Sequence, residues 1–99
     1  MFLWLVTVRA AEGRTPAVRR LLDGRLLPLL RAQPGCSRPT LAARTNCAGE
    51  HSCLAFWSSR SAIEDFEAHP AYQTLMDELA LLLRVPPKRA LWAGRATPT

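Results

Sequence analysis

The sequence predicts an α+β domain with the element order β-α-β-β-α-β, and three observations support this fold class. The chain has 99 residues, a length typical of one domain, which we assign to residues 1–99. Hydrophobic residues make up 48% of the chain and charged residues 21%, which favours a folded core over disorder. Two segments carry apolar residues at helical spacing, and shorter apolar runs lie before, between and after them.

The first element is a strand over residues 2–9. This segment is short, apolar and aromatic, and a loop follows it at 10–13. It is too short to span a bilayer, and no basic segment precedes it as in a signal peptide. We therefore expect a cytoplasmic protein with no membrane partner.

A helix follows, with Thr15 as its N-cap and Pro16 at its first position. Its apolar residues recur every three or four positions and form one stripe: Val18, Leu21, Leu22, Leu26, Leu29 and Leu30. Gly24 and Pro28 weaken this stripe, so we expect a kink or a loosened final turn in this helix. The turn residues at 33–35 end the helix.

Residues 36–46 and 51–57 predict two strands of a β-hairpin, with a turn at 47–50 between them. The first strand of this pair contains Pro39. Because proline cannot donate a backbone hydrogen bond, this strand suits the edge of a sheet or a bend. His51 lies next to the turn, and we expect its side chain to be solvated.

The second helical region divides into two pieces, 60–68 and 70–84. Ser59 is expected to cap the first piece, and Pro70 to open the second. Prolines then stop the helix, and a last strand follows at 88–96.

Both faces of the predicted sheet are apolar in its first and third strands. In the first strand, one face carries Phe2, Trp4, Val6 and Val8 and the other carries Leu3 and Leu5. In the third strand, one face carries Cys53, Ala55 and Trp57 and the other carries Leu54 and Phe56. The helices cover one face, and each large side chain left exposed on the other would forgo about 1.5–3 kcal/mol. A covering loop and the exposure of a few aromatics are alternatives, but a second copy of the sheet is the simplest solution, since two-fold dimers are the commonest oligomers. We therefore expect a homodimer through the sheet face, with Trp92 in this interface or in the core.

The charge and the cysteines argue against several classes of site. Thirteen basic residues and eight acidic ones give a net charge of +5, but the arginines are spread along the whole chain. The third strand lacks the glycine, the leading basic residue and the alternating aromatics of an RNA-recognition motif, so we expect no nucleic-acid partner. Cys36, Cys47 and Cys53 are odd in number and lack metal-ligand spacing. We expect free thiols and no metal site.

Four motifs give the chain a resemblance to a known family over about residues 2–96. The first strand runs into Ala-Ala-Glu-Gly at 10–13, the first helix ends in Gln-Pro-Gly-Cys at 33–36, the third strand ends in Phe-Trp-Ser-Ser at 56–59, and His-Pro-Ala-Tyr occupies 69–72. In this order the motifs resemble the antibiotic-biosynthesis-monooxygenase family. The resemblance implies a ferredoxin-like protomer with a four-stranded antiparallel sheet, which pairs sheet to sheet into a dimeric α/β barrel.

The resemblance also implies a ligand cleft between the sheet and the helices of each protomer. Members of the family include cofactor-independent oxygenases of quinols and aromatic polyketides, haem-degrading enzymes, and proteins without an established activity. The haem-degrading members rely on an Asn, a Trp and a His. In this chain the position of the Asn falls at Val6 or Thr7, that of the Trp near Phe66 and that of the His near Met76. None of the three residues is present there. Haem degradation is therefore not expected.

Oxidation without a cofactor requires a pocket that binds an aromatic ring, promotes deprotonation of its hydroxyl and excludes water. His69 and Tyr72 are the candidate catalytic residues, because His accepts a proton near neutral pH and Tyr orients a phenol or a hydroperoxide. Each has a structural alternative, His69 as a helix-break residue bonded to backbone and Tyr72 as a core aromatic. The candidate pocket residues, of which the tryptophans are equally suited to the core, are Trp4, Val6, Trp57, Phe66 and Met76.

Two hypotheses for the function follow. The first is a monooxygenase of a small aromatic or quinol-type substrate that needs no cofactor. The second is a non-catalytic, dimeric module of the same fold that binds a small ligand or acts in stress. Oxygen consumption with a hydroquinone or an anthrone favours the first, and thermal stabilisation by aromatic compounds without turnover favours the second.

Overall fold

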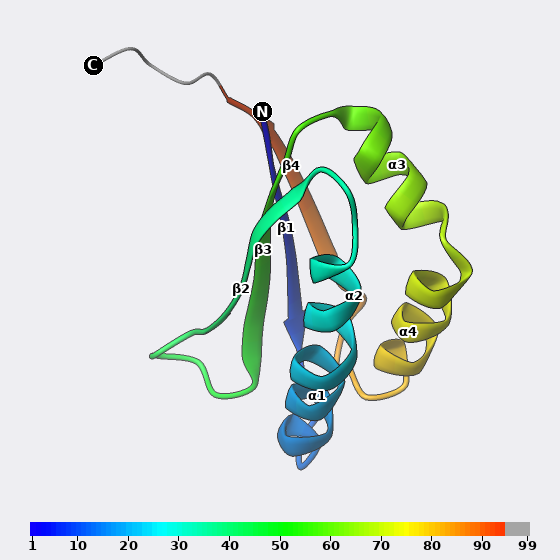
Figure 1. The fold of residues 1–99 in the computed structure, drawn as a ribbon. Coiled ribbons are helices and arrows are strands. Elements are labelled where there is room, and N and C mark those ends of the chain that lie inside the picture. The colour runs from blue at the N-terminus through cyan, green and yellow to red at the C-terminus, as the bar shows by residue number, and fades with distance from the viewer. Residues whose placement is uncertain (95–99) are drawn as a thin grey trace.

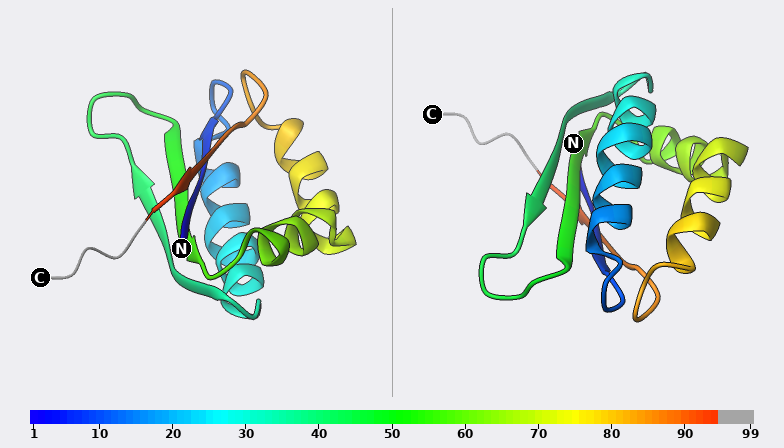
Figure 2. Two further views of the ribbon diagram at one scale, coloured as in Figure 1. Left: turned by 90° about the horizontal axis from the view of Figure 1, so that it is seen from above. Right: turned by 90° about the horizontal axis from the view of Figure 1, so that it is seen from below.

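A computed structural model describes residues 1–94 of the chain. It contains a four-stranded antiparallel sheet in the order β2-β3-β1-β4. The strands are β1 (Phe2–Arg9), β2 (Cys36–Ala43), β3 (Glu50–Trp57) and β4 (Lys88–Ala93). The helices pack on one face of this sheet and leave the opposite face open (Figures 1 and 2). The arrangement is the predicted ferredoxin-like α+β fold, with the element order β-α-β-β-α-β.

The first helical region has a loosened turn, but this turn lies in the middle of the region and not at its end, where the sequence predicts it. Its segments are α1 (Thr15–Leu21), the π-helical η1 (Leu22–Leu26) and α2 (Leu27–Arg31). The physical reason is Pro28, whose ring in a regular α-helix would clash with the carbonyl of Gly24, four residues earlier. In the wider turn the Leu27 N–H donates to the Leu22 carbonyl, five residues back, and the clash is avoided.

The start of this helix differs by one residue from the prediction. Thr15 is the first helical residue and Arg14 is the N-cap, so the assignment of Thr15 as the N-cap is wrong. The Arg14 N–H donates to the Ala11 carbonyl at 3.0 Å, and the Arg14 carbonyl accepts from the Val18 N–H at 3.0 Å. Backbone groups of the loop, rather than a side-chain hydroxyl, therefore start the helix. Pro16 takes its second position, where a missing N–H breaks no helical bond.

β2 is the bent edge strand that Pro39 predicts. Its pairing with β3 is irregular at Arg38, which has a positive φ of 52°. The hairpin turn begins early, because the Arg44 N–H donates to the Glu50 carbonyl at 3.0 Å. As a result β2 ends at Ala43 rather than at residue 46, and β3 begins at Glu50, one residue before the predicted start.

The second helical region forms two pieces, as predicted: α3 (Arg60–Ala68) and α4 (Pro70–Ala80). The Ser59 hydroxyl caps α3 by accepting from the Ala62 N–H at 3.1 Å. His69, with extended backbone, joins the two helices. Within residues 1–94, the structure contains no helix with the length and apolar character that a bilayer crossing requires.

α4 ends four residues before the predicted end, because the chain turns back to bond with the end of β1. The Ala11 N–H donates to the Leu82 carbonyl at 2.8 Å, and the Arg84 N–H donates to the Arg9 carbonyl at 2.8 Å. A continuing helix would keep these backbone groups for itself. Tertiary hydrogen bonds therefore override a helical period that continues in the sequence.

Two of the sequence motifs meet where the first helical region and β3 end. The Ser58 N–H donates to the Gly35 carbonyl at 2.9 Å. Gly35 has a φ of +83°, which favours glycine. A Cβ at Gly35 would also lie 2.7 Å from the Ser58 hydroxyl oxygen. Glycine is therefore required here both by backbone conformation and by space.

The open face of the sheet is apolar at one end and polar at the other. Three rows of paired residues cross it: Phe56-Leu3-Trp92, Leu54-Leu5-Ala90 and Ser52-Thr7-Lys88. Trp92 is 51% exposed, so it lies outside the core. β4 ends at Ala93, and residues 95–96, which the prediction assigned to this strand, lie outside the described part of the chain.

Candidate functional site

Four aromatic side chains from four different elements meet between the sheet and the helices. They are Trp4 of β1, Trp57 of β3, Phe66 of α3 and Tyr72 of α4, and none is more than 7% exposed. Phe66 lies at the centre, with ring-centroid distances of 5.8 Å to Trp4, 5.3 Å to Trp57 and 4.5 Å to Tyr72. We call these four residues the aromatic cluster. Most of its ring pairs are edge-to-face or tilted, the arrangement that aromatic quadrupoles favour.

The two indole N–H groups of the aromatic cluster differ in their partners. Trp4 Nε1 donates to Glu67 Oε2 at 3.2 Å. Trp57 Nε1 is buried and has no hydrogen-bond partner among residues 1–94. A buried donor without a partner is rare in folded proteins, and in a site it indicates a group that a ligand could satisfy.

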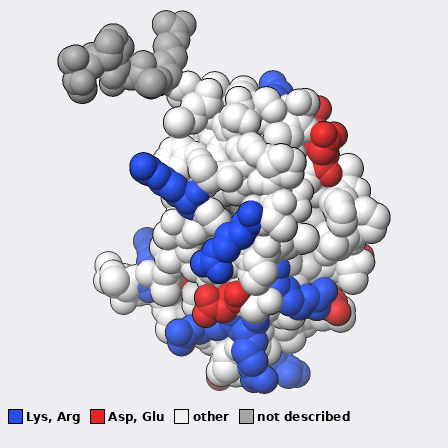
Figure 3. Space-filling model, in the orientation of Figure 1, with Lys and Arg blue, Asp and Glu red and all other residues white. Residues whose placement is uncertain are grey.

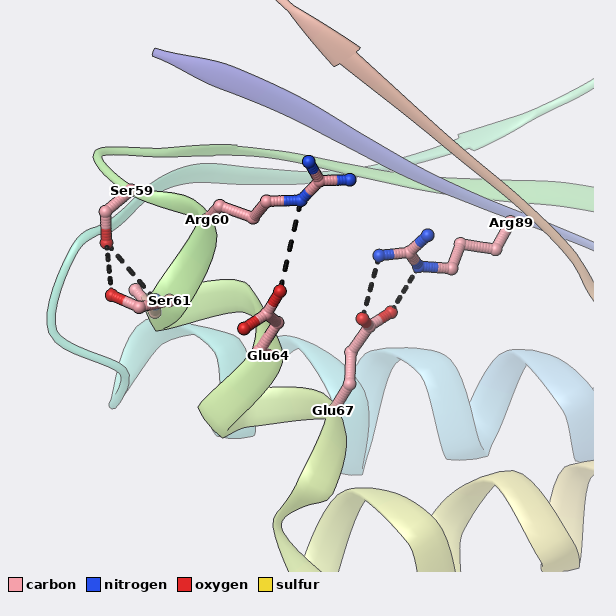
Figure 4. A network of polar contacts seen from close by, with 7 residues as sticks. Ser59, Arg60, Ser61, Glu64, Glu67 and Arg89 are labelled. Carbon is pink, nitrogen blue, oxygen red and sulfur yellow. Dashed lines mark hydrogen bonds and ion pairs between the residues drawn. The ribbon is translucent and has the colours of Figure 1, made fainter.

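An ion pair lies beside the aromatic cluster, between α3 and β4. Arg89 donates to Glu67 through Nε at 2.5 Å and through Nη2 at 2.8 Å (Figure 4). These hydrogen bonds raise the pKa of Arg89 above its usual value. The Glu67 carboxylate therefore accepts hydrogen bonds both from Trp4 of the aromatic cluster and from the Arg89 guanidinium. Its carboxylate fixes the position of α3 over the sheet.

Tyr72 stays protonated at neutral pH. Burial is the largest cause of its raised pKa, because the phenolate would lose hydration. The charge of Glu67 raises the pKa further, and that of Arg89 partly offsets this. The hydroxyl of Tyr72 is therefore available as a hydrogen-bond donor beside the aromatic cluster.

The other predicted site residues lie in different environments. His69 is exposed, and its Nδ1 caps α4 by accepting from the Ala71 N–H at 3.1 Å. Val6 is buried in the core, and Met76 is half-buried and packs against the core. The structure thus brings together Trp4, Trp57, Phe66 and Tyr72, and it places His69 at the helix break. A catalytic role for His69 stays a prediction.

His51 is buried, so the prediction that its side chain is solvated is wrong. Its side chain is 8% exposed and points to the helix side of the sheet, in one row with Cys53, Ala55 and Trp57. Following the alternation of β3 back from Trp57 would have identified this position. Sequence reasoning also missed Glu67 and Arg89, because no motif links residues of α3 and β4.

Burial keeps the Cys53 thiol, which lies in this row, and the Cys36 thiol protonated at neutral pH. Burial, with a smaller contribution from Cys36, raises the pKa of Cys53 to about 12. Burial also raises the pKa of Cys36. Cys36, Cys47 and Cys53 are free cysteines, as predicted. Among residues 1–94, no group of three or more His, Cys, Asp or Glu side chains is arranged to hold a metal ion.

Comparisons with known proteins give both a family match and a fold. The chain matches the family described as antibiotic biosynthesis monooxygenase over residues 1–78. A protein from Mycobacterium tuberculosis superposes with a TM-score of 0.85 at 22% sequence identity, over 99% of this chain and 98% of that chain. A proposed antibiotic biosynthesis monooxygenase from Deinococcus radiodurans has a TM-score of 0.89 at 21% identity, covering 100% and 98%.

A cofactor-independent oxygenase from Streptomyces nogalater is a third similar structure. Its TM-score is 0.79 at 20% identity, and the superposition covers 97% of this chain and 95% of that chain. No curated protein sequence matches the chain significantly. At such identities these structures establish a shared fold, and fold alone does not determine chemistry.

Proposed function

The chain belongs to the antibiotic biosynthesis monooxygenase family, and from this we propose that residues 1–99 form a cofactor-independent monooxygenase of a small aromatic or quinol-type substrate. The observation that carries this proposal is the aromatic cluster with the unpaired donor Trp57 Nε1 inside it. A ligand pocket for an aromatic ring needs apolar walls and few polar groups. The cluster supplies both.

In the proposed reaction the substrate provides the electrons that reduce O₂. Deprotonation of a phenolic hydroxyl gives an anion that can pass an electron to O₂, and the resulting peroxide loses water. One oxygen atom then stays on the ring carbon as a carbonyl, and the other leaves as water with the one hydrogen of that carbon and the proton that the hydroxyl released. The protein must bind the ring, hold the oxygen-bearing groups by hydrogen bonds and exclude water.

We assign the polar roles to three side chains. Trp57 Nε1 and the Tyr72 hydroxyl donate to the substrate oxygen or to the peroxide, and His69 accepts the proton. Because Nδ1 of His69 accepts the cap bond, Nε2 carries the hydrogen of the neutral imidazole. In our proposal Nδ1 therefore takes the substrate proton, and the cap bond from the Ala71 N–H breaks. The pocket walls in the proposal are the apolar residues Trp4, Val6, Phe66 and Met76.

Access to the aromatic cluster requires α3 to move, because the four rings are closed to solvent. Two features support such a movement. The extended residue His69 separates α3 from α4, so α3 can shift as one unit. The Glu67–Arg89 pair is partly exposed, with side chains 23% and 45% accessible, and it can open in water.

Oxygen consumption with anthrones and hydroquinones tests the proposal. We expect turnover by the wild type, and a decrease of about tenfold in kcat for Tyr72→Phe or Trp57→Phe, since each removes one hydrogen bond to the reacting oxygens. Trp92→Phe is the matched control on the open face and should retain activity. If a broad panel raises the thermal stability without consuming O₂, the chain is a ligand-binding module instead.

We also propose a homodimer through the open face of the sheet. The two apolar rows of this face contain Leu3, Leu5, Leu54, Phe56 and Trp92. Covering them with the same rows of a second copy would remove this surface from water without contacting the aromatic cluster.

The dimer is tested by sedimentation of Leu5→Lys against Thr7→Lys. The two positions lie on the same face, but Leu5 is in an apolar row and Thr7 is in the polar row. We expect the first variant to be monomeric and the second to remain dimeric. A monomeric wild type would contradict the proposal.

A further inference from the structure

A cleft lies at the His51 end of β3, six residues and about 20 Å along the strand from Trp57. Its volume is about 150 Å³, and it opens between the first helical region and the edge of the sheet. Its walls are formed by Arg19, Leu22, Asp23, Leu41, Ala42, Ala43 and His51. No ring of the aromatic cluster lines this His51 cleft, so the two sites are separate.

His51 gives this cleft a buried polar atom without a partner. The side chain is 8% exposed, and Nδ1 forms no hydrogen bond within the described part of the chain. Such an atom destabilises the fold unless something satisfies it. Since His51 lines the cleft, a ligand that enters the cleft can reach it.

The rim of the His51 cleft carries one cation, Arg19, and one anion, Asp23. Arg19 and Asp23 lie four residues apart and thus on the same side of the helix. Both are exposed, and neither is in an ion pair among residues 1–94. Arg20 lies beside them on a neighbouring surface hollow. Figure 3 shows basic side chains gathered over the lower part of the molecule, where α1 lies in Figure 1.

This rim favours a ligand with one negative charge. The Arg19 guanidinium can donate two parallel hydrogen bonds to a carboxylate. The carboxylate of Asp23 disfavours a second negative charge on the same ligand. The apolar walls, Leu22 and Leu41, suit a hydrocarbon body between the two polar ends of the cleft.

We propose that the His51 cleft binds a small hydroxylated monocarboxylic acid, with the carboxylate on Arg19 and the hydroxyl on His51 Nδ1. A hydroxyl both donates and accepts, so it satisfies Nδ1 in either tautomer of the neutral imidazole. A cavity of about this volume holds a body the size of benzene. The ligand therefore has one ring or a short chain. This site goes beyond the proposed oxygenation and does not depend on it.

Titration calorimetry with the full chain tests the proposal, with 4-hydroxybenzoate as the probe. Benzoate lacks the hydroxyl and phenol lacks the carboxylate, so each removes one of the two proposed contacts. We expect 4-hydroxybenzoate to bind most tightly and each analogue to bind about tenfold more weakly.

Matched variants assign the contacts. Arg19→Gln should lower the affinity for 4-hydroxybenzoate about tenfold. Arg20→Gln, at the adjacent position outside the cleft, should change this affinity less than about twofold. His51→Leu should remove the preference for 4-hydroxybenzoate over benzoate. The chain has two histidines, so in NMR spectra the ring signals of His51 should shift on binding while those of His69 serve as an internal reference.

Three results would overturn the proposal. The first is the absence of saturable binding at millimolar probe. The second is equal weakening by the Arg19 and Arg20 variants, which would indicate unspecific charge attraction. The third is a shift of Trp57 and Tyr72 signals instead of His51, which would locate the acid in the aromatic cluster. A failure to consume O₂ would leave the binding result unaffected, so the two proposals fail separately.

Discussion

The two ends of the inward-facing row of β3 follow one alternation but differ in packing. At one end Trp57 lies against Phe66 at 5.3 Å, in a cluster closed to solvent. At the other end His51 lines an open cleft of about 150 Å³. Each end holds one buried nitrogen that has no hydrogen-bond partner among residues 1–94, Trp57 Nε1 and His51 Nδ1. Burial alone therefore does not distinguish a packed core from a site, and a buried polar atom without a partner among residues 1–94 makes each end a candidate site.

The largest expected effect is the loss of stability when the packed end is truncated. Phe66→Ala should lower the free energy of unfolding by about 3–5 kcal/mol, because Phe66 touches the three other rings of the aromatic cluster. Leu41→Ala, at a half-buried position beside the existing cleft, should cost only about 1 kcal/mol. Urea denaturation measures both. Equal costs would contradict the difference in packing between the two ends.

Cys53 lies in the middle of the row, and its effect on stability can be measured at alkaline pH. The pKa of Cys53 is raised from 9.0 to about 12 in the fold, chiefly by burial. The folded state therefore holds a proton that the unfolded chain releases above pH 9.0, so stability is full below this pH and falls as the pH rises toward 12. The slope is about 1.4 kcal/mol per pH unit for one proton.

Cys53→Ala should flatten this alkaline decline in denaturation curves measured at several pH values. Val6→Ala is the control, since it removes core volume without removing a titrating group. It should lower stability by a similar amount at every pH. An unchanged slope in Cys53→Ala would assign the decline to other groups, of which Tyr72, whose pKa is also raised by burial, is the first to consider.

A smaller effect of opposite sign is expected at the open end. His51→Leu removes a buried nitrogen that has no partner, and the free energy of unfolding should rise by about 1 kcal/mol. The same substitution at His69 removes the cap on Ala71 and should lower stability by about 1 kcal/mol. Thermal unfolding of the ligand-free protein measures both. A loss of stability in His51→Leu would mean that the ring satisfies a structural need.

The two ends also differ in how far the sequence predicts them. The alternation of β1 and β3, the helical periods and the breaks at Pro28 and Pro70 were sufficient for the element order, and the resemblance to the family indicated the residues of the aromatic cluster. These patterns did not reveal His51, because a one-residue difference in the start of β3 turned a buried position into an expected turn position. They also missed the end of α4, where backbone hydrogen bonds to β1 compete with a helical period that continues in the sequence.

The polar partners of the packed end illustrate the same limit. Glu67 and Arg89 are 22 residues apart and meet only because β4 lies beside β1 in the folded sheet. No spacing rule connects a helix position to a strand position at that distance. Sequence patterns predict faces and periods well, whereas contacts between elements depend on how the faces are placed in space.

The smallest expected effect concerns the ion pair that closes the packed end. Arg89→Gln should lower the free energy of unfolding by about 0.5–1 kcal/mol, because both side chains are partly exposed and water screens the pair. The control is Arg60→Gln, which removes a more exposed pair with Glu64, 3.9 Å apart, and should cost less, about 0.3 kcal/mol. A double-mutant cycle with Glu67→Gln separates the pair from the hydrogen bond that Glu67 also accepts from Trp4.

Hydrogen exchange tests whether α3 moves to admit a substrate. If it does, Arg89→Gln should also speed backbone hydrogen exchange in α3. Exchange in η1, beside the His51 cleft, should stay unchanged, because the ion pair holds α3 and not η1.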